Sequence, residues 1–286
     1  MTNNKGNIIA ELRKEAGYTQ KSLAEALFIT DKAVSKWERG LSLPDASLLA
    51  KLSLLLDADI SLLLAHDGKH PNEGWCGLID LRNFEVDLSQ IVYDKPMVYF
   101  MLSHFLLLGI SKICVLTSKE NQDYLQSNIF ADLGLEIFFD FTKCTNNLMI
   151  LTQPCFLFGS DLTRQFQSAM ISHSVTKLVP DNMHAPFIFC PVEYAPIYWK
   201  HPDSLYELAT ARTLGRGMVC INMDCIDSSI DVANFVRMYQ KYTGLLIGSL
   251  EEIAYKKGLI NKEKLLETAK AVPYMEQLKS LVDTVK

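Results

Sequence analysis

Four polar side chains fall on one face of a short predicted helix near the start of the chain. They are Asp31, Lys32, Ser35 and Lys36. The same helical spacing turns Val34 and Trp37 to the opposite side, where they can join a core. Lysine can donate hydrogen bonds to guanine O6 or N7, and a carboxylate can accept one from cytosine N4. A polar face on a short, well-anchored helix is what reading the major groove of DNA requires.

Asp31 has a second interpretation at the start of this helix. Short polar side chains accept hydrogen bonds from the first free backbone N–H groups, so either Thr30 or Asp31 can be the cap. The sequence leaves open whether Asp31 caps the helix or faces a base.

The segment that must position this helix runs from Ile8 to about Leu64, and its apolar residues recur at helical spacing. No strand-like alternation interrupts them. Breaks fall at Gly17, at Ile29–Thr30 and at Gly40, where helix punctuation predicts them. We therefore expect an all-α domain of about five short helices over residues 1–66.

The whole of this domain carries a recognisable pattern. It reads LRKEAGYTQKSLAEALFITDKAVSKWERGLSLPDASLLAKLSLLLDADISLLL, with a Thr-Gln pair opening the second helix and Trp-Glu-Arg-Gly closing the third. The pattern resembles the helix-turn-helix domains of the phage-repressor or xenobiotic-response-element class. The resemblance implies phosphate contacts from Gln20 and Lys21, base contacts from Asp31, Lys32, Ser35 and Lys36, and a place near the DNA backbone for Arg39.

The charge of the domain bears on its partners. Over residues 1–66 Lys and Arg balance Asp and Glu, so a single copy would bind double-stranded DNA weakly. Domains of this shape generally read two half-sites about one DNA turn apart, so the rest of the chain should form a homodimer or higher homo-oligomer. A helical module that binds protein rather than DNA is the alternative.

The composition of the chain bounds its location. The 286 residues are 49% hydrophobic and carry a formal net charge of -5, which gives no overall attraction to an anionic membrane. The 7 Cys include no C-x-x-C pair and the N-terminus lacks a signal-peptide pattern, so we expect a cytoplasmic protein. The most apolar stretches fall short of the roughly 18 to 20 residues that cross a bilayer, so no membrane partner is expected.

The pattern changes after a polar segment, residues 67–74, which we interpret as an interdomain linker. Over residues 75–286, strand-like runs such as CGLIDL, KICVLTS and LMILTQ alternate with helical stretches such as PMVYFMLSHFLLLG. This alternation predicts an α/β domain with a mostly parallel, mixed sheet and helices on both faces. Further helices close the chain.

Three stretches of the second domain carry a second resemblance. They are VYDKPMVYFMLSHFLLLGISKICVLTS, CFLFGSDLTRQFQSAM and LGRGMVCINMDCIDSSIDVANFVRMYQKYTGLLIGSLEEIAYKKGLI. In this order they resemble the sugar-1-phosphate nucleotidyltransferases, and the glucose-1-phosphate thymidylyltransferases most closely. The resemblance covers most of residues 75–270 and implies a nucleotide-diphospho-sugar transferase-like fold.

The phosphate-binding loop of that family is missing. The family has a G-G-x-G-T-R-L loop whose backbone N–H groups and Arg hold the nucleotide phosphates. At the corresponding place, between Gly77 and Asp94, this chain is shorter and has no glycine. Arg82 is the only cation there, beside Asn83 and Phe84 in a setting unlike the loop, so we assign it no phosphate role.

The metal ligands of the family are also missing. The family holds Mg²⁺ between two aspartates, because a hard cation prefers carboxylate oxygen. By the resemblance the first position falls at or beside Pro154 and the second on Asn222. Asp224 lies two residues further on and could serve only in a shifted site. We expect no metal ligand, no catalytic residue and no cofactor.

These observations predict a DNA-binding transcriptional regulator that is not an enzyme. Its nucleotidyltransferase-like domain would serve for dimerisation, for sensing a nucleotide sugar or sugar phosphate, or for both. One alternative is an active sugar-1-phosphate nucleotidyltransferase that carries a regulatory DNA-binding domain. A second is a scaffold that binds an active homologue and brings it to DNA.

Overall fold

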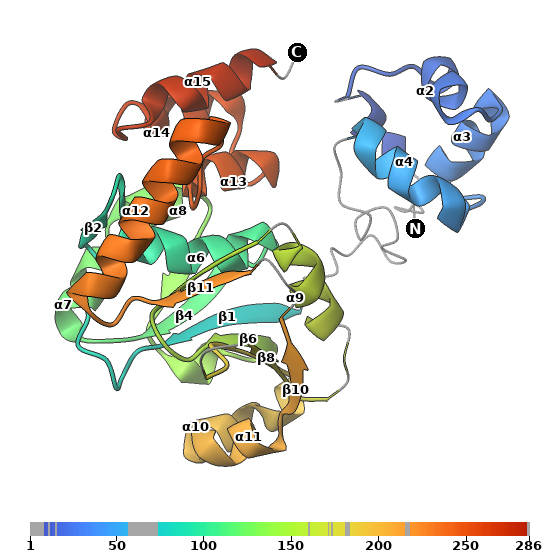
Figure 1. Cartoon of the computed structure of the whole chain (residues 1–286). Coiled ribbons are helices and arrows are strands. Elements are labelled where there is room, and N and C mark those ends of the chain that lie inside the picture. The colour runs from blue at the N-terminus through green and yellow to red at the C-terminus, as the bar shows by residue number, and fades with distance from the viewer. Residues whose placement is uncertain are drawn as a thin grey trace. The chain divides into compact units, whose positions relative to one another are not determined.

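Figure 1 shows the computed structural model of the chain, which describes residues 9–10, 12–14, 16–56, 74–159, 161–170, 172, 174–180, 184–214 and 218–284. The chain divides into two compact units, the first ending at Glu73 and the second beginning at Gly74. Of the predicted linker, residues 67–74, only Gly74 lies within the described residues.

The first unit is built from short helices around one small core. Residues 9–10 and 12–14 are helical, and α2 (Gln20–Leu27), α3 (Asp31–Glu38) and α4 (Ala46–Leu56) follow. Their buried side chains include Leu23, Leu27, Val34, Trp37, Leu49, Leu52 and Leu56. The predicted helix-turn-helix arrangement is confirmed, while the predicted fifth helix falls in residues 57–73, outside the described residues.

The second unit contains a seven-stranded sheet in the order β10-β8-β9-β6-β1-β4-β5. Its strands are β1 (Trp75–Asp80), β4 (Lys112–Leu116), β5 (Glu136–Phe138), β6 (Asn147–Leu151), β8 (Thr176–Val179), β9 (Phe187–Cys190) and β10 (Thr210–Thr213). β1 pairs in parallel with β4 and β6, as do β4 with β5 and β8 with β10, whereas β9 is antiparallel to β6 and β8. The predicted mostly parallel, mixed sheet is confirmed.

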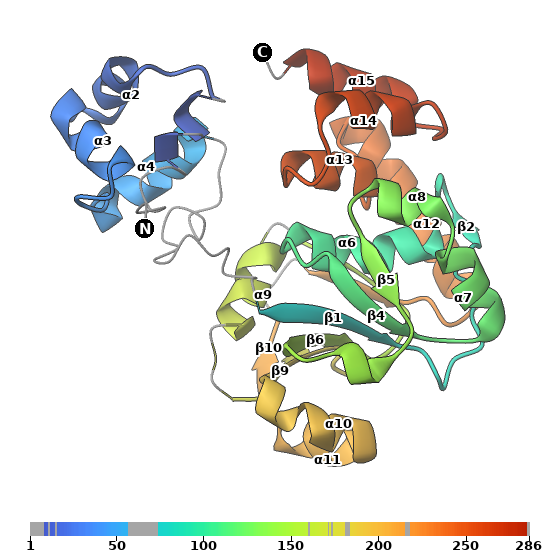
Figure 2. The same ribbon diagram turned by 180° about the vertical axis from the view of Figure 1, so that it is seen from behind.

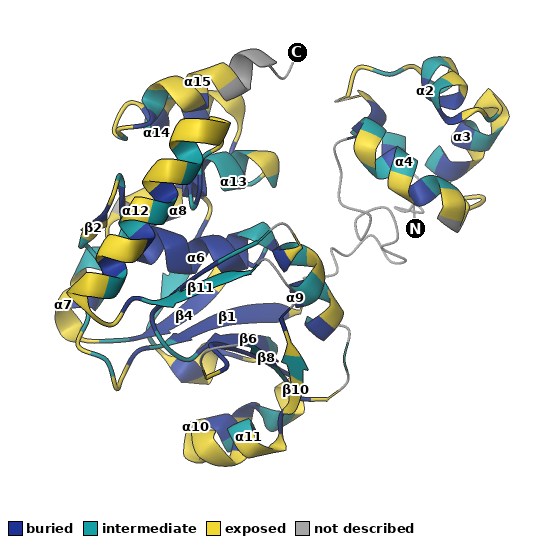
Figure 3. Cartoon of the chain, in the orientation of Figure 1, coloured by how far each residue is buried: buried dark blue, intermediate teal, exposed yellow. Residues whose placement is uncertain are grey.

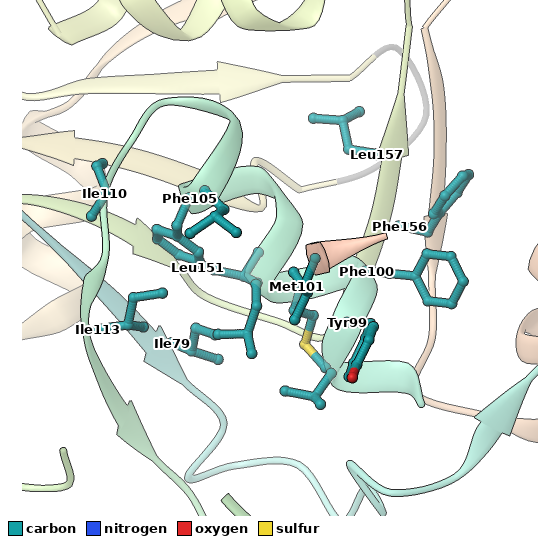
Figure 4. Packing of buried hydrophobic residues seen from close by; sticks show 14 of the residues in the cluster. Ile79, Tyr99, Phe100, Met101, Phe105, Ile110, Ile113, Leu151, Phe156 and Leu157 are labelled. Carbon is teal, nitrogen blue, oxygen red and sulfur yellow. The ribbon is translucent and has the colours of Figure 1, made fainter. Parts of the chain in front are cut away.

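Alternate residues of the central strands face two different cores. Ile79 and Leu151 pack with α6 (Met97–Leu107) on one face, where Figure 4 shows them near Phe105. Leu78 and Ile150 pack on the other face with residues of α10 (Ala195–Lys200) and α11 (Pro202–Leu208). Figures 1 and 2 show α6 and the α10–α11 pair on opposite sides of the sheet. Because strand side chains alternate, such near-continuous apolar strands are buried on both faces.

The remaining elements complete the second unit. Two short antiparallel pairs are β2 (Ile91–Val92) with β3 (Lys95–Pro96) and β7 (Cys155–Phe158) with β11 (Val219–Asn222). The other helices are α7 (Lys119–Leu125), α8 (Asn128–Asp132), α9 (Leu162–Met170), α12 (Ile226–Thr243), α13 (Leu250–Lys256), α14 (Lys262–Ala269) and α15 (Met275–Thr284), with 3₁₀ turns at Phe141–Lys143 and Val192–Tyr194. No described helix combines the length and apolar character that crossing a membrane demands.

A buried polar cluster ties the C-terminal helices to α6. The Glu251 carboxylate, only 2% exposed, accepts hydrogen bonds from the hydroxyls of Tyr99 at 3.2 Å and Tyr274 at 2.9 Å. Lys95 is fully buried, pairs with Asp94 at 2.8 Å and places its Nζ 4.0 Å from the centre of the Tyr274 ring. Burying a charge is costly unless the charge has partners: Lys95 is paired with Asp94, and Glu251 accepts hydrogen bonds from the two tyrosine hydroxyls.

Candidate functional site

The start of α3 is fixed by Thr30 rather than by Asp31. Thr30 is the residue before the helix, and its Oγ1 accepts a hydrogen bond from the backbone N–H of Ala33 at 3.3 Å. Asp31 is the first helical residue, and its carboxylate accepts from the backbone N–H of Lys32 at 2.8 Å. Since Thr30 supplies the cap, the Asp31 carboxylate lies exposed at the edge of the outward face.

The outward face of α3 gathers the residues that the sequence predicts to read bases. Asp31, Lys32 and Lys36 are exposed and Ser35 is half-buried. Val34 and Trp37 lie on the opposite side, 0% and 5% exposed, within the core of the first unit. Arg39 follows the helix and is also exposed, and its Nε donates to the carbonyl of Ser35 at 3.2 Å. A rigid core therefore holds a polar, partly cationic face to solvent.

The start of α2 is linked to the end of α3 by a half-buried carboxylate. Glu38 pairs with Arg13 and accepts a hydrogen bond from the Gln20 side-chain amide at 2.7 Å. Burial opposes ionisation of Glu38, but the hydrogen bonds from Arg13 and Gln20 outweigh it and hold the pKa of Glu38 below its ordinary value. The Gln20 amide thus positions α2 against α3, which the sequence did not reveal.

The first turn of α2 remains suited to an anion. Thr19 caps the helix through its hydrogen bond from the backbone N–H of Ser22 at 3.0 Å. The first backbone N–H groups of a helix have no partner inside the helix, so Gln20 and Lys21 can meet a phosphate through the backbone. Lys21 is exposed, and its ammonium group can contact the same phosphate.

In the second unit, several backbone N–H groups of the loop that follows β1 donate hydrogen bonds to other groups of the protein. The bonds run from Leu81 to the Leu116 carbonyl at 2.8 Å, from Phe84 to the Leu81 carbonyl at 3.0 Å, from Leu88 to the Asn121 side chain at 3.0 Å and from Ser89 to the Asp87 side chain at 2.9 Å. A phosphate-binding loop depends on free N–H groups that converge on the anion. These four N–H groups already have acceptors within the protein.

A polar and aromatic cluster occupies the carboxyl end of β1. The guanidinium of Arg82 donates two hydrogen bonds to Asp80, at 2.9 and 2.7 Å, and the hydroxyl of Tyr198 donates to the same carboxylate at 2.8 Å. Arg82 also lies 5.0 Å from the centre of the Trp199 ring, which stacks on Phe141 with ring centres 4.6 Å apart. In open α/β sheets, ligands bind outside the carboxyl ends of the parallel strands. Here side chains of the protein fill part of that space.

The charge of the Asp80 carboxylate is stabilised by residues of the same cluster. Burial of Asp80 disfavours its charged form, but hydrogen bonds from Arg82 and Tyr198 hold the pKa of Asp80 below its ordinary value. The Arg82 guanidinium is thus paired with Asp80 within the protein. The sequence singled out neither Asp80 nor Tyr198, because 118 residues separate the two partners along the chain.

Pro154 and Asn222, which the resemblance places at the family's metal positions, lie side by side at one end of the β7–β11 pair. Asn222 stands opposite Cys155 in the β7–β11 pair, and the backbone N–H of Met223 donates to the Pro154 carbonyl at 2.7 Å. The Asn222 side chain donates to Asp224 at 2.9 Å, and its Oδ1 is buried without a hydrogen-bond partner. Within the described ranges, no three His, Cys, Asp or Glu residues gather around a common metal position. A proline side chain offers no oxygen ligand and the Asn222 side chain is neutral, so these two residues do not form the carboxylate pair that commonly binds Mg²⁺.

A cavity of about 330 Å³ lies elsewhere in the second unit, between the end of α6, β7, α9 and the α12–α13 connection. Its walls are mainly apolar, with Phe100, Phe158 and Leu246 among them. Glu252 and Lys256 also line it and form an ion pair at 2.8 Å. A mainly apolar cavity with a few polar groups is the usual form of a small-molecule site.

Comparisons with known proteins agree with the two resemblances. Residues 9–63 match the model of the helix-turn-helix family. The HTH-type transcriptional regulator ImmR of Bacillus subtilis is 42% identical over 62 residues, which cover 22% of this chain and 49% of that protein. This first unit is a helix-turn-helix domain. The chain spans about half the length of that regulator.

The second unit is similar to a glucose-1-phosphate thymidylyltransferase. A glucose-1-phosphate thymidylyltransferase of Neisseria meningitidis is 24% identical over 247 residues, covering 63% of this chain and 85% of that protein. A solved structure of a UDP-glucose pyrophosphorylase from Acinetobacter baumanii overlaps with a TM-score of 0.44 at 10% identity, covering 60% of this chain and 95% of that chain.

Proposed function

We propose that this protein is a cytoplasmic, sequence-specific DNA-binding transcriptional regulator. The observation that carries the proposal is the outward face of α3, where Lys32 and Lys36 are exposed while Val34 and Trp37 anchor the helix. The similarity of this domain to a transcriptional regulator supports the same function. In this proposal α3 enters the major groove and the first turn of α2 lies against the DNA backbone.

Selection of DNA from a random duplex pool by the purified full-length protein tests this function. We expect enrichment of a sequence with two related half-sites about one helical turn apart. A protein whose outward α3 face is replaced, through Lys32→Ala with Lys36→Ala, is the control, and it should enrich nothing. Failure of the unaltered protein to enrich any sequence would contradict the proposal.

We propose further that the second unit is not a nucleotidyltransferase. Three features support this: the occupied N–H groups after β1, the Asp80–Arg82 pair, and the replacement of both metal carboxylates by Pro154 and Asn222. In-line attack on a phosphate needs charge neutralisation and accurate positioning, and each feature removes part of them. Release of pyrophosphate from a nucleoside triphosphate and glucose 1-phosphate with Mg²⁺ would overturn this part, with Asp224 as the first residue to replace.

The second unit, in this proposal, forms the homodimer, senses a nucleotide sugar or sugar phosphate, or does both. The cavity beside α13 is the proposed effector site, since its apolar walls suit a base or sugar ring and Lys256, whose side chain is 53% exposed beside its partner Glu252, can also contact a phosphate. Calorimetric titration with nucleoside diphosphate sugars, sugar 1-phosphates and nucleoside triphosphates tests sensing.

The variant Lys256→Glu makes the effector test specific to this cavity. It should weaken binding of an anionic effector by about tenfold or more, because it replaces attraction by repulsion. Lys262→Glu on α14 is the matched control, since Lys262 is exposed and does not line the cavity. Absence of binding across the whole panel would exclude the sensing role and leave dimerisation.

A further inference from the structure

The outward face of α12 is unusually apolar for a surface that no described element covers. Four large apolar side chains lie on it: Ile226, 71% exposed, Ile230, 52%, Met238, 48%, and Tyr242, 71%. The opposite side of the helix buries Ser229, Val232 and Val236 in the body. Figure 3 shows the exposed face as a nearly continuous stripe along the helix. Apolar side chains gathered in this way mark an interaction surface more often than chance exposure does.

The charged residues on the same face are segregated by sign. Asp227 and Asp231 lie in the first half of α12, and Arg237 and Lys241 lie in the second half, all exposed. Each pair has the same charge at a spacing of four residues, which destabilises an isolated helix. None of the four forms an ion pair with another residue of the described part of the chain.

The face is symmetric about the exposed side chain of Asn234. The residues eight, seven, four and three positions before Asn234 are Ile226, Asp227, Ile230 and Asp231. The residues at the same distances after it are Tyr242, Lys241, Met238 and Arg237. Every apolar residue on one side therefore has an apolar counterpart on the other, and every acid has a base.

We propose that this face binds a second copy of the same chain, with the two α12 helices antiparallel about a two-fold axis at Asn234. In a two-fold interface, a residue of one copy meets the residue of the other copy that lies equally far on the opposite side of the axis. Asp231 of one copy then meets Arg237 of the other, Asp227 meets Lys241, and Ile230 meets Met238. Each contact occurs twice, and the like-charge pairs within one helix become opposite-charge pairs between helices.

This inference deepens the proposed function and rests on it only for the need for a dimer. A parallel arrangement would place acid against acid, so the charges select the antiparallel one. The helix dipole alone also favours acids near the start and bases near the end of a helix. It accounts for neither the four exposed apolar side chains nor their symmetric spacing.

Charge-reversal variants distinguish two reasons for the segregated charges of α12, contact with a second copy and the dipole of the helix. Analytical ultracentrifugation of the full chain without DNA should show a dimer. Asp231→Arg or Arg237→Asp alone should raise the dimer dissociation constant by about tenfold or more, because each places two like-charge contacts in the interface. The double variant restores opposite charges at both contacts and should return to within about threefold of the unaltered protein. If only the helix dipole determines the charges, the dimer dissociation constant of the double variant should be no lower than those of the single variants.

A control and a second variant complete the test. Asp203→Arg on α11 reverses an exposed charge outside the α12 face and should leave the dimer unchanged. Ile230→Asp should dissociate the dimer while leaving the circular dichroism spectrum intact. A monomeric unaltered protein, a dimer that tolerates every one of these changes, or a double variant without rescue overturns the proposed surface. DNA selection by the unaltered protein is a separate readout, so failure of the surface and failure of the regulator are distinguishable.

Discussion

The buried histidine of α6 makes the stability of the second unit depend on pH. His104 is 2% exposed; its Nδ1 lies 3.2 Å from the Met101 carbonyl oxygen, and its Nε2 lies 3.0 Å from the Leu157 carbonyl oxygen and 3.3 Å from the Leu157 backbone nitrogen. Burial lowers the pKa of His104 to about 4, although hydrogen bonds to the Leu157 and Met101 carbonyls act in the opposite direction. The Phe187 ring, 5.1 Å away between centres, adds to the apolar surroundings that disfavour an imidazolium ion.

The sign and size of the effect follow from the two protonation states. An unfolded histidine has a pKa near 6.5, so the unfolded chain binds a proton as the pH falls while folded His104 stays neutral. The contribution is fully present above pH 6.5 and is lost as the pH falls toward 4. Between pH 7.5 and pH 5.0 the loss in unfolding free energy is about 2 kcal/mol, and the full loss approaches about 3 kcal/mol.

Urea unfolding at pH 7.5 and pH 5.0 measures this loss. With Trp37→Phe as a common background, tryptophan fluorescence reports only Trp75 and Trp199 of the second unit. His104→Gln should remove most of the pH dependence in this range, whereas His201→Gln, at an exposed site, should leave it unchanged. Equal pH dependence in the His104 variant and the unaltered protein would refute the assignment to this buried ring.

Three further substitutions test the interactions that stabilise the two units. Glu251→Leu leaves the buried hydroxyls of Tyr99 and Tyr274 without their acceptor, so urea unfolding of the second unit should show a loss of about 3 kcal/mol; a loss below 1 kcal/mol contradicts the network. Phe28→Gly removes a non-glycine residue at φ 60° whose side chain is 89% exposed, and calorimetry should show the first unit stabilised by about 1 kcal/mol rather than weakened. Glu38→Gln removes a carboxylate whose pKa is lowered on folding. As the pH falls below about 4.5, the first unit of this variant should therefore lose less unfolding free energy than the first unit of the unaltered protein. The same acid profile in both proteins would contradict the role of the Glu38 ion pair.

Much of the fold follows from local patterns in the sequence. The first unit is predictable because caps at Thr19 and Thr30 precede regularly spaced apolar residues. The parallel core is predictable because its strands are short apolar runs separated by helical stretches. The edge strand β10, of sequence TART, escaped prediction because it is mostly exposed and has no apolar alternation.

Other differences have equally local causes. The stretch NQDYLQSNIFADLG has a helical pattern throughout, but it is interrupted at Gln126–Ser127 and forms α7 and α8. The strand-like run PFIFCPVEY forms a strand only up to Cys190, because Pro191 ends the ladder and the chain then turns through a 3₁₀ turn into α10. Its apolar character gave no sign of the change, since both elements bury residues in the same core.

Sequence patterns predict some features of the candidate sites and miss others. The outward face of α3 is predictable because its residues lie within two helical turns of one another. The Arg13–Glu38–Gln20 cluster and the Asp80–Tyr198 contact join residues far apart along the chain, so no spacing rule indicates them. The sequence predicts that Pro154 and Asn222 stand at the metal positions, but it does not reveal the Asp80, Arg82 and Tyr198 contacts at the end of β1.

Binding of the selected duplex, measured over a range of salt concentrations, tests whether α3 reads DNA. Lys32→Ala with Lys36→Ala should weaken specific binding by about a hundredfold or more and bring it close to binding of unrelated DNA. Lys262→Ala, which alters an exposed lysine of α14, should bind as the unaltered protein does. Undiminished specific binding by the double α3 variant would show that α3 does not read the bases.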